Sequence, residues 1–250
     1  MIAHNGVILM NDKKELNQKL LEACIADKID LTYIEQLLKD GANPLGCVKD
    51  DDGDNNLYDV VLYHFLELEQ ADKDDSAFFK ITELFLKYGM DISQPEIAYD
   101  PGYILNPLWG LAFFSSETAR RTLKLLLDHG LDADSARECW GHKWSDLWLA
   151  RFTVDDDFDR ELAIDSFKTL MLVASYPRIL EEDSDFKRVI WFDENNYDLT
   201  KFRDWDKYDY VLEPTVNQDL TKSLIRIFEK DTKKEVWNFG FELSPEEYKS

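Results

Sequence analysis

The chain has 250 residues, of which 44% are hydrophobic, and its 51 acidic and 29 basic side chains give a formal net charge of −22. This apolar content excludes a wholly disordered chain, and this length is sufficient to bury a substantial core in one or two domains. The acidic balance argues against binding to nucleic acid or to an anionic membrane, because phosphate groups require a basic face.

The N-terminal region carries no sign of a secretory signal or of a membrane span. Its first residues, MIAHNGVILMNDKKEL, lack a basic start and contain only a short apolar run, VILM. No apolar run in the chain approaches the ~20 residues of a spanning helix. Three widely spaced cysteines, Cys24, Cys47 and Cys139, give no disulfide framework. We therefore expect a cytoplasmic protein in a reducing compartment.

Three segments close an apolar helical pattern with a glycine: LLKDGANP, LFLKYGMDIS and LLLDHGLDAD. The glycines are Gly41, Gly89 and Gly130, which lie 48 and 41 residues apart. Glycine is favoured just after a helix because it adopts the left-handed conformation without steric cost. The recurrence therefore predicts three helices that end in the same way.

Each of these glycines ends a predicted pair of helices. The predicted pairs are 16–27 with 32–41, 55–69 with 76–89, and 106–114 with 115–130. Thr32 is the expected N-cap of the second helix, with Glu35 completing a capping box, and Ser115 or Ser116 caps the last one. Apolar residues recur at i, i+3, i+4 and i+7, so each helix has one face to bury. Repeated helix pairs predict a solenoid whose units bury these faces by stacking.

The turns and helix ends resemble those of ankyrin repeats, which carry D-x-x-G-x-T-P-L-H before the first helix and L-L-x-x-G-A-[DN] after the second. The segment DDDGDNNLY from Asp50 matches the Asp, Gly and Leu of that turn, NPLW at 106–109 follows its T-P-L-H part, and LLKDGANP is close to the family ending. A degenerate fourth unit extends over 144–177, so that the resemblance covers roughly 14–180. The spacing exceeds the family's ~33 residues, and EQADKDDS is inserted in the second unit. The resemblance implies a mainly α, ankyrin-like helical-hairpin solenoid, and another helical-hairpin solenoid is the competing interpretation.

Beyond residue 180 the helical pattern gives way to four β-like runs, RVIWF, YDYVL, SLIRIFEK and EVWNFGFEL. The last two alternate in polarity around DTKK and predict a β-hairpin near 223–243. A lone hairpin is only marginally stable, so we expect it to pair with the earlier strands or to pack on the last helical unit. The prediction is therefore helical repeats over 1–180 and a β-rich C-terminal cap over 181–250, α+β as a whole.

The sequence contains no set of residues typical of catalysis or of metal binding. The run DDDGDN resembles part of a calcium loop, but with Gly53 at the sixth position the twelfth is Asp59 instead of Glu. Cys139 and His142 in CWGH are only two ligands, and Cys24 is typical of a small core residue. Neither G-x-S-x-G, a P-loop nor G-x-G-x-x-G occurs. We expect no enzymatic activity, no cofactor and no metal site.

Acidic clusters interleaved with aromatic residues predict a protein-binding surface, because Trp and Tyr surrounded by charge are typical of interface hot spots. The aromatic residues are equally typical of a core, and for the segment 140–160 both interpretations stay open. The candidate partner-binding residues are Asp51, Asp52, Asp54, Trp140, Trp144, Asp155, Asp156, Asp157, Trp205 and Asp206.

Acidity, predicted repeats and the lack of a catalytic set together predict a binding module for one basic protein, with no nucleic-acid or membrane partner and monomeric when free. In this make-up the chain resembles the ankyrin-type immunity proteins of bacterial toxin systems, which implies that it neutralises a cationic toxin. Complementary charge speeds such capture. Three alternatives stay open: a regulatory or scaffold adaptor with no basic partner, a DNA-mimic inhibitor, and an enzyme with a cleft between the β-rich part and CWGH.

Overall fold

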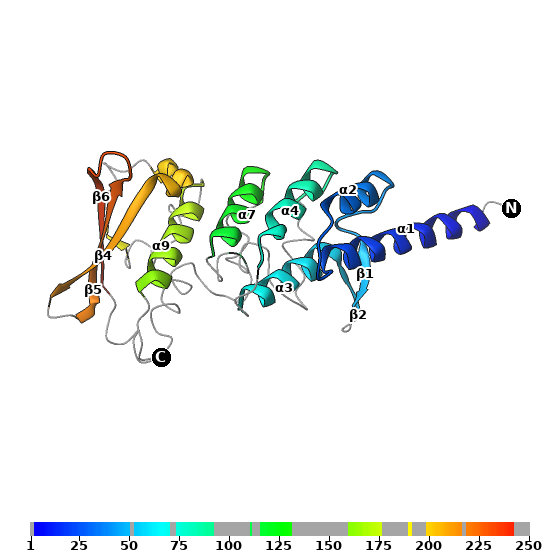
Figure 1. Cartoon of the computed structure of the whole chain (residues 1–250), viewed down its shortest axis with the longest axis horizontal. Coiled ribbons are helices and arrows are strands. Elements are labelled where there is room, and N and C mark those ends of the chain that lie inside the picture. Colours follow the sequence, from blue (N-terminus) through cyan, green and yellow to red (C-terminus); the bar gives the residue numbers. More distant parts are fainter. Residues whose placement is uncertain are drawn as a thin grey trace. The chain divides into compact units, whose positions relative to one another are not determined.

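The structure is a computed structural model, and it describes residues 3–50, 53–70, 74–92, 111, 116–131, 160–176, 190–191, 199–216 and 219–242. The chain divides into two compact units, Met1–Leu131 and Asp132–Ser250. The first unit contains helices and a short β-ribbon, and the second contains helices and an antiparallel sheet (Figure 1). The prediction of a mostly helical chain with a β-rich C-terminal part is thus confirmed.

The helices of the first unit are α1 (Ala3–Cys24), α2 (Leu31–Lys39), α3 (Leu57–Gln70), α4 (Ala77–Lys87) and α7 (Glu117–Asp128). Helix α1 contacts α2 and α3, α2 contacts α4, and α4 contacts α7. In Figure 1, α2, α4 and α7 lie side by side in one row. Five of the predicted helices are present, with α1 beginning earlier than expected; of the sixth, 106–114, only the buried Leu111 lies among the described residues.

The apolar faces of α3 and α4 meet in an aromatic cluster. Ring centroids are 6.1 Å apart for Tyr58 with Phe78, 6.1 Å for Tyr58 with Phe85, and 5.0 Å for Phe65 with Phe78. The Tyr58 and Thr82 hydroxyls are hydrogen-bonded at 3.3 Å, which satisfies a polar group that this core would otherwise leave unpaired. The periodic apolar positions of the sequence therefore form the core between these two helices.

Three helices end in the same way, as the repeated glycines predict. Gly41, Gly89 and Gly130 have positive φ angles of 102°, 94° and 97°. After each glycine, the next residue donates its backbone N–H to a carbonyl in the last turn of the helix, the bond that defines a Schellman motif. These donor and acceptor pairs are Ala42 with Leu37 at 3.0 Å, Met90 with Phe85 at 2.9 Å, and Leu131 with Leu126 at 3.0 Å. Since all six of these residues are buried, each helix end is also fixed by apolar contact.

One of the two predicted N-caps is correct. Ser116 caps α7, because its Oγ accepts the Ala119 N–H at 3.0 Å. The cap of α2 is Asp30 and not Thr32: Asp30 Oδ1 accepts the N–H groups of Thr32 and Tyr33 at 3.0 and 3.2 Å. Helix α2 begins one residue before Thr32, so Thr32 lies within its first turn.

A short β-ribbon precedes α3. Strands β1 (Cys47–Asp50) and β2 (Gly53–Asn56) pair antiparallel, with Cys47 opposite Asn56 and Asp50 opposite Gly53. The segment predicted as a turn from Asp50 therefore contains strand β2 and the first residues of α3.

The second unit consists of α9 (Arg160–Ala174), β3 (Ile190–Trp191), the 3-10 helix η2 (Leu199–Lys207), β4 (Tyr208–Val216), β5 (Asp219–Glu229) and β6 (Glu235–Glu242). The strands pair antiparallel in the order β3-β6-β5-β4. The predicted hairpin is the β5–β6 pair, and the other two predicted strands are present as β3 and β4.

One face of this sheet forms the core of the second unit. Ile225, Ile227 and Trp237 are buried, and the ring of Phe202 in η2 lies 5.1 Å from that of Trp237. Helix α9 packs on η2 and β4. Helix α9 belongs to the compact unit Asp132–Ser250. Across the ranges described here, no helix is long and apolar enough to cross a bilayer.

Candidate functional site

The structure describes three of the ten predicted partner-binding residues, Asp54, Trp205 and Asp206. Asp54 lies in β2, in register with Lys49 of β1. Asp51 and Asp52 lie between the paired ends of the two strands, outside the described residues. The other residues outside the described part are Trp140, Trp144, Asp155, Asp156 and Asp157.

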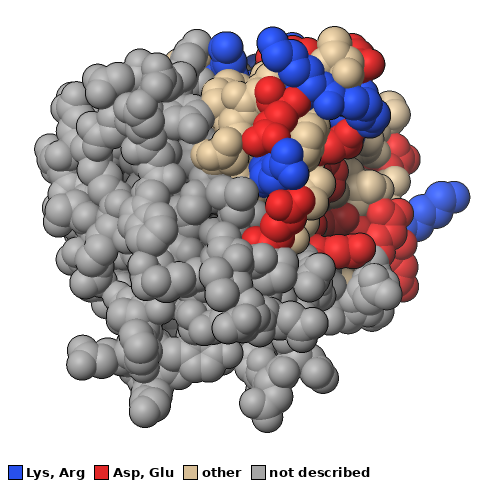
Figure 2. All heavy atoms as spheres, turned by 90° about the vertical axis from the view of Figure 1, so that its left-hand side faces the viewer, with Lys and Arg blue, Asp and Glu red and all other residues tan. Residues whose placement is uncertain are grey.

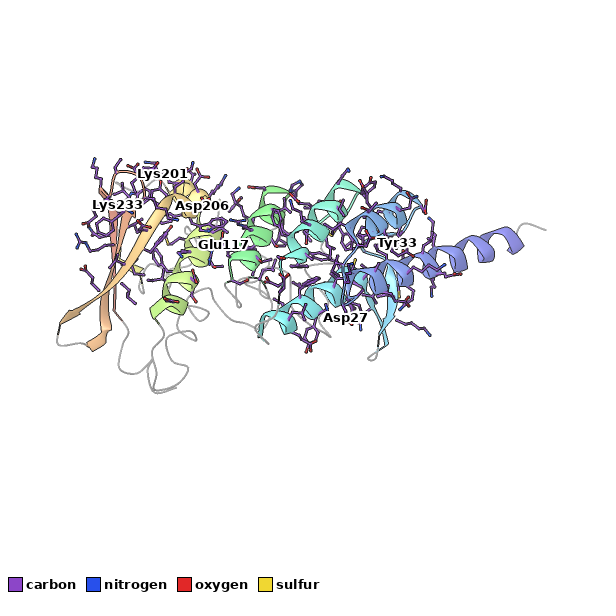
Figure 3. The ribbon with its side chains drawn as sticks, in the orientation of Figure 1. Asp27, Tyr33, Glu117, Lys201, Asp206 and Lys233 are labelled. Atoms are coloured by element: carbon purple, nitrogen blue, oxygen red, sulfur yellow. The ribbon has the colours of Figure 1, made fainter. Side chains whose placement is uncertain are left out.

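Trp205 is not a surface anchor, which corrects the prediction. Its side chain is only 6% exposed, and it shares the inner side of η2 with Phe202. Asp206 is exposed, as a partner-binding residue requires (Figure 3).

Hydrogen bonds link α1 to the β-ribbon and to the turn that precedes it. Asn17 Oδ1 accepts the Asn43 N–H at 2.8 Å, and Gln18 Oε1 accepts the Lys49 N–H at 3.1 Å. Asn17 and Val48 are both buried. Strand β1 is therefore linked directly to α1 through Lys49.

A second set of hydrogen bonds joins the ribbon to the start of α3. The Leu57 N–H donates to the Gly46 carbonyl at 3.0 Å. Asn56 Nδ2 donates to the Leu45 carbonyl at 3.4 Å, and Asn56 Oδ1 accepts the Tyr58 N–H at 2.9 Å. The β1–β2 ribbon is therefore linked by hydrogen bonds to α1 and to the start of α3.

Glu35 links two helices instead of closing a capping box within α2. Its Oε1 accepts hydrogen bonds from Lys87 Nζ at 2.7 Å and from the Tyr88 hydroxyl at 2.9 Å, both in or beside α4. Lys39 Nζ lies 3.4 Å from Oε2. The hydrogen bonds from Lys87 and then Tyr88 lower the pKa of Glu35 to about 2. This carboxylate is therefore already engaged within the first unit.

Two exposed tyrosines were missed by the sequence analysis. Tyr33 on α2 and Tyr63 on α3 are 48% and 47% exposed, and together with Leu31 and Val211 they are the large hydrophobic residues exposed in the described part of the chain. A signal was present, because both tyrosines lie off the apolar stripe of their helices. An exposed aromatic side chain of this kind is typical of a contact residue.

Most basic side chains of the described surface are close to a carboxylate of their own helix or sheet. On the face shown in Figure 2, acidic and basic residues are interspersed. Close pairs within single helices are Lys19 with Glu15, Lys80 with Glu83, Arg121 with Glu117, Lys124 with Asp128, Lys168 with Asp165 and Lys207 with Asp204. Even if every basic residue paired once, the net charge of −22 would remain as unmatched carboxylates.

The described residues include no group of three or more His, Cys, Asp or Glu side chains placed to hold a metal ion. Cys24 and Cys47 are both free thiols. Burial raises the pKa of the Cys24 thiol, which keeps it protonated and unreactive. Comparisons with protein-family models, with curated proteins and with solved structures found no match.

Proposed function

We propose that the chain is a non-catalytic, acidic protein-binding module that neutralises one basic protein, such as a toxin, in the cytoplasm. The observation that carries this proposal is the net charge of −22, which exceeds what pairing with the chain's own basic residues can neutralise. Such a field steers a cationic protein toward the surface and raises its association rate.

We infer that the first unit is built from ankyrin-like repeats, with α1–α2 and α3–α4 as successive helical hairpins. Three features support this inference: the contacts of α2 with α4 and of α4 with α7, the Schellman ends of α2, α4 and α7, and the ribbon that leads into α3. Repeats of this kind bury their apolar faces against their neighbours and leave their turns free for recognition.

The end of the β1–β2 ribbon is the proposed contact element. It carries Asp51, Asp52 and Asp54, and hydrogen bonds link the ribbon and the turn before it to α1 and α3. In this proposal the acidic segment at 155–157 and the exposed Asp206 add to the field that attracts the partner.

The first experiment is capture from a lysate of the native host, washed at low and then at high salt, with the bound proteins identified by mass. We expect one strongly basic polypeptide in 1:1 ratio. With that polypeptide purified, its association rate should fall at least about tenfold between 20 and 300 mM salt, because screening removes long-range attraction. An association rate that does not change with salt contradicts the proposal, and several neutral partners would indicate a scaffold or adaptor.

A matched pair of triple variants separates the proposed contact element from net charge. One variant carries Asp51→Asn, Asp52→Asn and Asp54→Asn at the ribbon. The control carries Glu15→Gln, Glu83→Gln and Asp165→Asn, which remove three carboxylates that pair with lysines of their own helices. We expect the ribbon variant to raise the dissociation rate and the control to leave it unchanged. Equal effects would exclude the ribbon as the contact element.

A further inference from the structure

A groove of about 280 Å³ lies between the C-terminal end of α1 and the start of α2. Its lining combines two alanines, one tyrosine and four charged side chains: Lys19, Glu22, Ala23, Ala26, Lys28, Asp30 and Tyr33. It is separate from the ribbon described above, since neither β1 nor β2 contributes a lining residue. Figure 3 shows Tyr33 on α2 and Asp27 beside the end of α1.

The groove lies where exposed apolar surface is concentrated. Leu31 and Tyr33, both in the first turn of α2, are 36% and 48% exposed. They are two of the four large hydrophobic residues that are exposed within the described part of the chain. Ala23 and Ala26 add apolar lining that an aliphatic stem can contact.

The charges around the groove favour a cation. Lys19 Nζ lies 2.6 Å from Glu15 Oε1, so its positive charge is already matched by a carboxylate of α1. The other charged lining residues are the two carboxylates of Glu22 and Asp30 and the ammonium group of Lys28. The exposed Asp27 adds one more carboxylate beside the groove.

We propose that this groove receives an arginine side chain of the basic partner, an inference that rests on the proposed function. The planar guanidinium stacks on the exposed ring of Tyr33 and donates hydrogen bonds to the carboxylates of Glu22 and Asp30. The aliphatic stem of the arginine lies against Ala23 and Ala26. A lysine offers a single point charge and no planar face, so it binds more weakly here.

The charge of Asp30 can be removed without removing the N-cap that this residue provides for α2. Asp30 Oδ1 caps α2, and Asn caps helices about as well as Asp through its own side-chain oxygen. Asp30→Asn therefore removes the negative charge while keeping the acceptor for Thr32 and Tyr33.

The test uses hexa-arginine amide as the ligand for the whole chain, with binding measured by calorimetry in 50 mM salt. We expect Tyr33→Ala and Asp30→Asn each to weaken binding about three- to tenfold, in keeping with the loss of a cation–π contact or of one charge-assisted hydrogen bond. Lys28→Ala should tighten binding about twofold, because it removes the opposing positive charge. The matched control is Tyr63→Ala, which removes an equally exposed tyrosine from α3 and should leave the affinity unchanged.

Equal affinities for Tyr33→Ala and Tyr63→Ala would overturn the arginine groove, and so would binding of hexa-lysine as tight as that of hexa-arginine. Circular dichroism of each variant verifies that it is folded, which is expected because the replaced side chains are exposed. The proposed function is tested separately by the salt dependence of capture of the basic protein. If that dependence holds while Tyr33→Ala has no effect, the groove is wrong and the proposed function stands.

Discussion

Gly41 and Gly46 lie in the same turn region, but replacing each by alanine destabilises the fold for a different reason. At Gly41 φ is 102° and an added Cβ meets no heavy atom within 4 Å, so the cost is backbone strain alone. We expect Gly41→Ala to lower the free energy of unfolding by about 1–2 kcal/mol, with a smaller loss for Gly41→Asn. Urea unfolding followed by circular dichroism measures both losses, and equal losses for Ala and Asn would contradict the left-handed geometry.

At Gly46 the cost is a collision. An added Cβ would lie 1.9 Å from Asn17 Nδ2, and Asn17 is buried while it accepts the Asn43 N–H. We expect Gly46→Ala to lower the free energy of unfolding by about 3 kcal/mol, because the clash also disturbs that hydrogen bond. The same urea experiment should rank it above Gly41→Ala, and the reverse order would show that Asn17 moves aside without cost.

Glu35 predicts a pH dependence. Its folded pKa is lowered to about 2 by the hydrogen bonds from Lys87 and Tyr88, below the ordinary value of 4.5. A lowered folded pKa stabilises the fold at pH values above the unfolded pKa, and this contribution is lost as pH falls through the folded pKa. We therefore expect Glu35→Gln to be less stable than the native chain at pH 7, with the difference shrinking between pH 4.5 and 2.

The matched control for Glu35 is Glu83→Gln, since Glu83 pairs with Lys80 of its own helix, α4, and has no ion pair with another helix among the described residues. Urea unfolding at a series of pH values compares the three proteins. The free energies of unfolding of the native chain and of Glu35→Gln could instead differ by the same amount down to pH 2. That result would show that the link between α2 and α4 does not depend on the charge of Glu35.

At the scale of elements, the side chains of strand β5 alternate between the two faces of the sheet. Those on one face pack in the core, and those on the other face form ion pairs. Ile225 and Ile227 point into the core, whereas Arg226 between them faces the other side of the sheet and bridges its neighbours. Arg226 donates to Glu213 of β4 at 3.3 Å and, through Nε, to Glu235 of β6 at 3.1 Å. The core contacts on one face and the ion pairs of Arg226 on the other therefore both hold β5 between β4 and β6.

This alternation predicts which substitutions in the sheet matter. Ile227 is completely buried and pairs in register with Trp237, so Ile227→Ala should lower the free energy of unfolding by about 3 kcal/mol. Val211 on β4 is 40% exposed, and Val211→Ala should cost no more than about 0.5 kcal/mol. Hydrogen exchange of peptides from 219–242 locates the effect. Equal protection in both variants would contradict the assignment of the core face.

At the scale of the whole molecule, the charge of −22 acts on stability as well as on binding. Like charges repel one another in the compact state, and salt screens this repulsion over about 10 Å at 0.1 M. We expect the melting temperature to rise between 20 and 200 mM sodium chloride. The same rise in choline chloride would show that screening is the cause and not binding of sodium. A falling melting temperature would mean that attractive ion pairs outweigh the repulsion.

Features set by neighbouring residues could be predicted from the sequence. The glycines that end α2, α4 and α7 act through their own backbone angles, and the alternation of β5 and β6 acts over a few residues. The strands and most helices were therefore found near their observed bounds. Asp206 is exposed, and its role in partner binding, like that of the ribbon residues, stays a prediction.

Only the tertiary structure decided which side chains remain available. Glu35 looks like part of a local capping box, but its partner Lys87 is 52 residues away along the chain. Trp205 looks like a surface anchor, but its side chain is buried, as is that of Phe202 in the same segment. Local patterns determine where helices and strands begin and end because their hydrogen bonds are short-range. Burial and pairing depend on which elements meet, and that is decided by contacts between residues far apart in the sequence.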